Sequence, residues 1–201
     1  MTPLVLASQS PARRTTLRNA GVEPVVIVSG VDESQVTGVA PAELALQLAE
    51  LKCAAVADRD DLPPRALVLG CDSVLELDGE PLGKPADAAE AVRRWHAMRG
   101  RSGVLHTGHS LRDTGTGHVA AATASTTVHF ADVTDEEVAA YVATGEPLQV
   151  AGAFTVDGLG GAFVTRIEGD HHNVVGLSLP LLRELLVELG HSWTAFWTAG
   201  S

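Results

Sequence analysis

Lysine is the scarcest charged residue in this chain. The sequence of 201 residues holds 14 basic side chains against 25 acidic ones, and only Lys52 and Lys84 are lysine. The formal net charge of −11 repels polyanions, which argues against DNA or RNA as a partner. Since arginine supplies nearly every other positive charge, the two lysines are candidates for a specific task.

Cysteine is also rare, and long apolar runs are missing. Cys53 and Cys71 could form one bridge at most, and their apolar surroundings predict reduced residues in the core. The sequence shows no segment of about 18 apolar residues and no basic, apolar leader, so we expect a soluble cytoplasmic protein without membrane contact. The eight histidines lack zinc-binding spacing.

What the chain does contain is the composition of a globular protein, with 45% apolar and 19% charged residues. Its length fits one domain over residues 1–201. Apolar runs, turn residues and capping pairs alternate along the chain and predict an α/β fold. We expect strands over residues 4–7, 24–28, 66–77, 102–113, 119–131 and 162–167, and helices over 11–21, 41–57, 87–100, 134–145 and 177–189.

The helix predicted over residues 41–57 carries one of the two lysines. Leu44, Leu48, Leu51 and Ala55 mark its expected apolar stripe. Lys52 lies at the edge of that stripe, so its stem can pack while its ammonium reaches a polar site.

The segment after the first strand is a candidate phosphate cradle. Ser8 and Ser10 offer hydroxyls, the helix start offers unpaired amides, and Arg13 and Arg14 add fixed cations. An ordinary capped helix with two solvated arginines explains the same residues.

A carboxylate interrupts the third predicted strand. Asp72 shares its side-chain direction with Val68 and Val74, and burying a carboxylate is costly unless it is paired or liganded. Asp72 is therefore a proton acceptor, a metal ligand or a hydrogen-bonded turn residue.

Several short motifs follow one another in a fixed order, and together they are far more specific than any one of them. They are Leu6–Arg14 (LASQSPARR), Val31–Glu33, Leu51-Lys52, Gly70–Val74, Gly83-Lys84-Pro85, Gly145–Phe154 and Gly169–Leu177. The series resembles the Maf family of nucleoside triphosphate pyrophosphatases over essentially the whole chain. Gly83-Lys84-Pro85 is no P-loop, because Pro85 takes the position of the Ser or Thr that would hold magnesium.

The resemblance implies a fold, an activity and a set of roles. It implies an elongated mixed sheet flanked by helices, with two lobes around a nucleotide-binding cleft, often as a homodimer. It implies hydrolysis of a nucleoside triphosphate to the monophosphate and pyrophosphate with a divalent metal, Mg²⁺ or Mn²⁺. Asp72 matches the proton acceptor and, with Glu33, the metal-binding positions. Ser8, Arg13, Lys52 and Lys84 match positions that bind the triphosphate.

The base preference is open at this point. The resemblance is closer to the subgroup that cleaves 7-methyl-GTP, because Asp157 stands where other members have Gln. An acidic group accepts from the guanine edge and also from the cytosine amino group, whereas Gln suits uracil or thymine. Ser73 matches neither subgroup, and Gly103 stands where a His is common in the family.

Two other functions compete with that of an enzyme clearing modified nucleotides. One is a nucleotide-binding regulator of cell division and septum formation, which has no need for Asp72 beside Glu33, Lys52 and Lys84. The other is a pyrophosphatase of the inosine triphosphate type, with a related fold and the same products.

Overall fold

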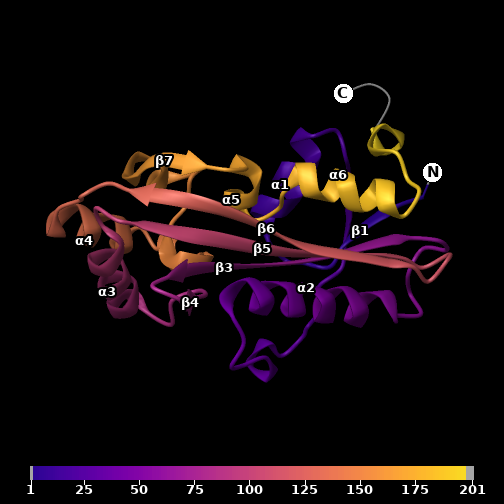
Figure 1. Cartoon of the computed structure of the whole chain (residues 1–201), viewed down its shortest axis with the longest axis horizontal. Helices are drawn as coiled ribbons and strands as arrows, with labels where there is room; N and C mark the ends of the chain where they lie inside the picture. Colours follow the sequence, from indigo (N-terminus) through magenta and orange to yellow (C-terminus); the bar gives the residue numbers. More distant parts are fainter. Residues whose placement is uncertain (1, 198–201) are drawn as a thin grey trace.

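Within the described part of the chain, seven strands form one mixed sheet that runs the length of the molecule (Figure 1). The computed structural model describes residues 2–197. The strands are β1 (Leu4–Leu6), β2 (Val25–Val26), β3 (Leu67–Leu77), β4 (Glu80–Leu82), β5 (Ser102–Asp113), β6 (Val119–Phe130) and β7 (Val164–Glu168). The α/β class expected from the sequence is confirmed.

Helices flank the sheet and join its strands. The α-helices are α1 (Pro11–Asn19), α2 (Pro41–Ala57), α3 (Ala88–Met98), α4 (Asp135–Ala143), α5 (His171–Val175) and α6 (Leu179–Glu188). Short 3₁₀ helices are η1 (Glu33–Gln35), η2 (Glu146–Gln149), η3 (Ala151–Ala153), η4 (Leu159–Phe163) and η5 (Trp193–Phe196). None of the helices within residues 2–197 is both long and apolar enough to cross a membrane.

The strand order is β2-β1-β3-β5-β6-β7, with β4 also paired to β3. β1 pairs in parallel with β2 and β3, and the remaining pairs are antiparallel. The parallel pairs at the start of the chain need helical connections, whereas the antiparallel pairs β3–β4 and β5–β6 are joined by short turns. One such turn, at Asp78 and Gly79, has positive φ at both residues and joins β3 to β4.

The core divides along the sheet into two ends, as the two expected lobes require. At one end, α1 and α6 pack on one face of β1 and β3, while α2 packs on the opposite face (Figure 1). At the other end, Trp95 of α3 is buried and makes edge-on contacts with Phe130 of β6 and Tyr141 of α4. β3 contributes to both, with Leu67 and Leu69 in one end and Leu75 and Leu77 in the other.

α2 spans the residues predicted for it, but its buried face differs from the predicted stripe. Lys52 is buried on the side facing the sheet, whereas Leu51 is 38% exposed and Ala55 is also exposed. The reason is close approach: a Cβ at Gly70 would lie 2.1 Å from Ala49 O. Ala45 and Ala49 therefore face the sheet beside Leu48. Of the predicted stripe, Leu48 is buried as expected, and the assignment of Leu51 and Ala55 to it is wrong.

Smaller differences occur towards the C-terminus. β7 begins two residues later than predicted, and the exposed His171 and His172 open α5. Both cysteines are free and buried, as predicted, and burial raises the pKa of the Cys71 thiol to about 12. That thiol is inert at neutral pH.

A buried histidine ties β5 to the start of α6. His109 Nδ1 lies 3.0 Å from Thr107 O, and its Nε2 accepts the Ser178 N–H at 2.9 Å. Burial lowers the pKa of His109 to about 4, and protonation at Nε2 would abolish the second bond.

We expect the free energy of unfolding to decrease as the pH falls from 7.5 to 5. The unfolded chain takes up a proton at His109 below about pH 6.5, whereas the folded chain stays neutral down to about pH 4, so acid favours unfolding in that window. Urea unfolding at the two pH values measures this loss. His109→Gln should weaken the pH dependence, and an unchanged dependence in that variant would contradict the assignment.

Candidate functional site

The edge of β3 is interrupted between the two ends of the molecule. β1 pairs with β3 up to Leu69, and β4 begins its pairing at Leu75. Because β5 covers the other edge of β3, residues 70–74 have a registered partner on one side only. Ser8 follows β1 and Lys84 follows β4, so segments from both ends of the molecule meet at this gap in the sheet edge.

Three charged side chains come together beside the gap. Lys52 Nζ lies 2.5 Å from Asp72 Oδ1 and 2.7 Å from Glu33 Oε1. The side chains of Lys52 and Asp72 are 11% and 12% exposed, whereas that of Glu33 is 56% exposed. We call Lys52, Asp72 and Glu33 the charged cluster; it unites three of the residues predicted for the site.

Two glycines bring α2 close enough for this contact. A Cβ at Gly108 would lie 2.2 Å from Ala45 O, just as one at Gly70 would strike Ala49 O. Gly108 is the registered partner of Asp72 on β5. Any side chain at either position would push α2, and Lys52 with it, away from the carboxylate. Sequence reasoning missed Gly108, since its importance depends on strand register.

The charged cluster holds Asp72 in a partly desolvated state. Burial raises the pKa of Asp72 above its usual value, although Lys52 and Arg13 act in the opposite direction. A carboxylate shielded from water but held by cations has the properties of a proton acceptor. Its second oxygen, Oδ2, makes none of the hydrogen bonds found among the described residues.

Arg13 is buried, and nearly all of its guanidinium N–H groups donate hydrogen bonds within the protein. Its Nε donates to Gly176 O at 2.7 Å, Nη1 to Ser8 Oγ at 3.1 Å and Cys71 O at 2.9 Å, and Nη2 to Ser73 Oγ at 3.0 Å. No carboxylate among the described residues lies within ion-pair distance of this guanidinium. Arg13 therefore contributes a fixed positive charge beside Asp72, with few donors left for a ligand.

A chain of polar side chains continues from Arg13 across the sheet. Ser73 Oγ lies 3.0 Å from Thr107 Oγ1, which donates to Asn173 O at 3.2 Å. Ser73 and Thr107 are registered partners on β3 and β5. Sequence reasoning gave neither residue a role here, because their pairing appears only once the strands are aligned.

The remaining residues predicted to bind substrate lie outside the charged cluster. Ser10 caps α1, accepting the Arg13 N–H at 3.5 Å. Arg14 is exposed and lies 3.6 Å from Glu23, because consecutive helical residues point in different directions. Arg14 is thus not brought to the charged cluster. Lys84 and Asp157 are exposed on loops at the α3 and α4 end.

The structure offers two carboxylates for a divalent cation rather than a complete cage. Within residues 2–197 no group of three or more His, Cys, Asp or Glu side chains is arranged to hold a metal. Asp72 and Glu33 nevertheless converge on one ammonium and supply hard oxygen donors. Such a pair fits Mg²⁺, which usually binds one or two carboxylates and completes its shell with water and substrate phosphates.

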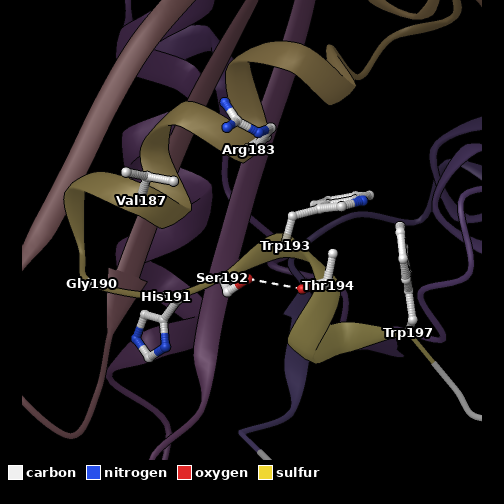
Figure 2. Close-up of a pocket in the computed structure, with 8 residues that line it drawn as sticks. All are labelled: Arg183, Val187, Gly190, His191, Ser192, Trp193, Thr194 and Trp197. Atoms are coloured by element: carbon white, nitrogen blue, oxygen red, sulfur yellow. Dashed lines mark hydrogen bonds between the residues drawn. The ribbon is translucent and has the colours of Figure 1, made fainter.

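A separate pocket of about 540 Å³ lies between α6 and η5 (Figure 2). Trp193 and Trp197 stand on one side of it and Arg183 on another, and Ser192 and Thr194 bond to each other (Figure 2). None of its lining residues is a carboxylate. It therefore lacks the carboxylates that the charged cluster offers.

The family of the chain follows from comparison with known proteins. The family described as Maf-like protein matches residues 3–189. The chain belongs to the Maf family. This Maf protein is 64% identical to a nucleoside triphosphate pyrophosphatase of Salinispora tropica, covering 98% of this chain and 88% of the relative.

Further relatives carry the same name. Identity is 62% to a nucleoside triphosphate pyrophosphatase of Streptomyces coelicolor, over 96% of this chain and 94% of the relative. The identity to a nucleoside triphosphate pyrophosphatase of Cutibacterium acnes is 50%, over 98% of this chain and 95% of the relative. Among solved structures, the Staphylococcus aureus Ham1 protein matches at a TM-score of 0.45 and 20% identity, covering 65% of this chain and 73% of that one.

We expect Arg13→Lys to lower the free energy of unfolding by about 2–4 kcal/mol, because a single ammonium cannot span the acceptors on Ser8, β3 and the residue after α5. Urea unfolding measures the loss. Arg14→Lys is the matched control, and its exposed pairing predicts a change within about 0.5 kcal/mol. Equal effects of the two substitutions would contradict the structural role of Arg13.

Proposed function

We propose that this Maf protein is a nucleoside triphosphate pyrophosphatase, a hydrolase that cleaves a nucleoside triphosphate into the monophosphate and pyrophosphate. The observation that carries the proposal is the buried Asp72 carboxylate held against Lys52 at a gap in the sheet edge. Membership of the Maf family and the name shared by its relatives support the same activity.

In the proposed reaction, Asp72 takes a proton from a water molecule, whose oxygen attacks the α-phosphorus. A bond forms between that oxygen and the α-phosphorus, the bridge to the β-phosphate breaks, and pyrophosphate leaves with the electron pair. Lys52 is shared between Asp72 and Glu33 and can turn towards the phosphate oxygens. In the proposal, Ser8, Ser10 and the start of α1 bind the phosphates from one side of the gap, and Lys84, on the loop after β4, binds them from the other.

A divalent cation, Mg²⁺ or Mn²⁺, is part of the proposal. Asp72 and Glu33 are the residues that would hold it, and when bound it neutralises charge on the triphosphate oxygens. We also propose a homodimer, which the family resemblance implies, and a cytoplasmic location.

The proposed substrates are modified or non-canonical nucleotides, removed before they enter nucleic acids. Asp157 is exposed and free of hydrogen bonds to other described side chains, so its carboxylate is available to a base. The family resemblance favours 7-methyl-GTP, whose base presents hydrogen-bond donors to an acceptor.

We expect Asp72→Asn to reduce pyrophosphate release by at least about 100-fold, because an amide cannot take the proton from water, while triphosphate binding is retained. Pyrophosphate release and equilibrium binding of the nucleotide with Mg²⁺ measure the two effects separately. Asp61→Asn, which alters an exposed pair with Arg59, is the matched control. Near-normal turnover of Asp72→Asn would show that another group activates the water.

Asp157→Gln should shift the substrate preference towards UTP or dTTP, since an amide offers both a donor and an acceptor to a pyrimidine edge. The values of kcat/KM for GTP, 7-methyl-GTP, CTP, UTP and dTTP measure the shift, with Asp61→Gln as control. An unchanged profile would remove Asp157 from base recognition.

A further inference from the structure

The loop that carries Asp157 is short and sits between two 3₁₀ helices. We call residues 155–160 the Asp157 loop; it lies between η3 and the body of η4. Its tip, Asp157 and Gly158, is exposed. A side chain that distinguishes bases must be held within a fraction of an ångström, so an exposed loop of this kind needs support from beneath.

A single carboxylate provides that support. Glu146 Oε1 accepts hydrogen bonds from Thr155 Oγ1 at 2.6 Å and from Gly160 N at 3.0 Å, and Glu146 Oε2 accepts one from Leu159 N at 3.0 Å. Tyr141 Oη, on α4, donates to the same Oε1 at 2.9 Å. Glu146 therefore accepts hydrogen bonds from both ends of the Asp157 loop and, through Tyr141, links them to α4.

The two loop glycines fit closely around this anchor. A Cβ at Gly158 would lie 2.6 Å from Glu146 Oε2, and one at Gly160 would lie 2.4 Å from Tyr141 Oη. Tyr141 Oη also accepts the Thr155 N–H at 3.2 Å. The loop backbone thus follows the shape of the Glu146–Tyr141 pair, and larger residues would lift it away.

The Glu146 side chain, the anchor of this loop, has to be ionised. Burial alone would raise the pKa of Glu146, but hydrogen bonds from Thr155 and the amides of Leu159 and Gly160 outweigh it, and the pKa lies below its usual value. An ionised carboxylate only accepts, so all four donors can be satisfied at once. A glutamine would offer one accepting oxygen and would turn an NH₂ group towards the remaining donors.

We propose that Glu146 is a positioning residue that fixes the Asp157 loop and thereby sets the selectivity for the nucleobase. The proposal rests on the proposed function, and it adds a residue that supports recognition without touching substrate. Glu146 makes no contact with Lys52, Asp72 or Glu33 among its hydrogen bonds in the described residues. Its loss should therefore change which base is accepted more than the rate of cleavage.

The test is a double-mutant cycle of Glu146→Gln and Asp157→Gln. Selectivity is the ratio of kcat/KM for the best triphosphate to that for the poorest, over the five nucleotides used above. We expect Glu146→Gln alone to lower this ratio about tenfold, the effect of roughly 1.4 kcal/mol, with kcat for the best substrate within about a factor of two. In the Asp157→Gln background the same substitution should add no further change, because it acts through Asp157.

A purely structural role is tested by a matched substitution on α4, the helix that carries Tyr141. Glu137 Oε2 accepts the Thr134 N–H at the start of α4, away from the Asp157 loop. Glu137→Gln should leave selectivity unchanged. Hydrogen exchange at the Leu159 and Gly160 amides should accelerate in Glu146→Gln and not in Glu137→Gln, which reports loss of the anchor independently of activity.

The outcomes separate the two proposals. If the wild-type protein releases no pyrophosphate, the proposed function fails and this inference falls with it. If it is active and Asp157→Gln changes selectivity while Glu146→Gln does not, the inference alone is overturned. Additive changes in the double variant also overturn it.

A milder variant covers the case in which Glu146→Gln does not fold. Thr155→Val keeps the shape of the side chain and removes the shortest contact to Glu146. It should lower selectivity in the same direction and by less, and an unchanged ratio would count against the anchor.

Discussion

The ammonium of Lys52, held between Asp72 and Glu33, is the interaction on which the site depends. One buried carboxylate on a strand would be costly alone, and one buried lysine on a helix would be equally costly. The ion pair offsets the cost of burying each charge, and it requires a fixed spacing between α2 and β3. Gly70 and Gly108 provide that spacing by letting the helix backbone approach the sheet. A compact ammonium can serve two carboxylates from one point, which a planar guanidinium does less readily.

Arg13 adds the second positive charge beside this interaction, which matters for how an acidic chain can host a triphosphate. The net charge is −11, yet the buried cations Arg13 and Lys52 lie close to the gap in the sheet edge. Arg13 is bound by neutral acceptors, so its charge is not cancelled by a carboxylate in contact with it. Charges shielded from water act more strongly than those on the surface. Together, Arg13 and Lys52 balance the Asp72 and Glu33 carboxylates, so the gap repels an anion less than the acidic surface does.

The sequence predicted individual elements better than their arrangement. The helix of α2 and the strand of β3 follow from their apolar patterns and turn residues, and Asp72 stands out because it breaks an apolar strand. The sequence placed Lys52 only at the edge of the buried face of α2, because the leucines predicted a different face. In the structure Lys52 is buried. Ser73, Thr107, Gly108 and Glu146 could not be assigned from sequence, since their contacts depend on strand register or on residues distant along the chain. Base selectivity is hardest to predict, because it depends on the pose of one exposed loop.

The division of labour within the molecule follows from this arrangement. Chemistry is assigned to the gap between the two ends of the sheet, and recognition to a loop at the α3 and α4 end.

The most direct measurement is hydrolysis in water labelled with ¹⁸O, followed by mass spectrometry of both products. Attack of the water activated by Asp72 on the α-phosphorus places the label in the nucleoside monophosphate and leaves pyrophosphate unlabelled. Label in pyrophosphate, or release of inorganic phosphate from the γ-position, would contradict the proposed reaction at this site.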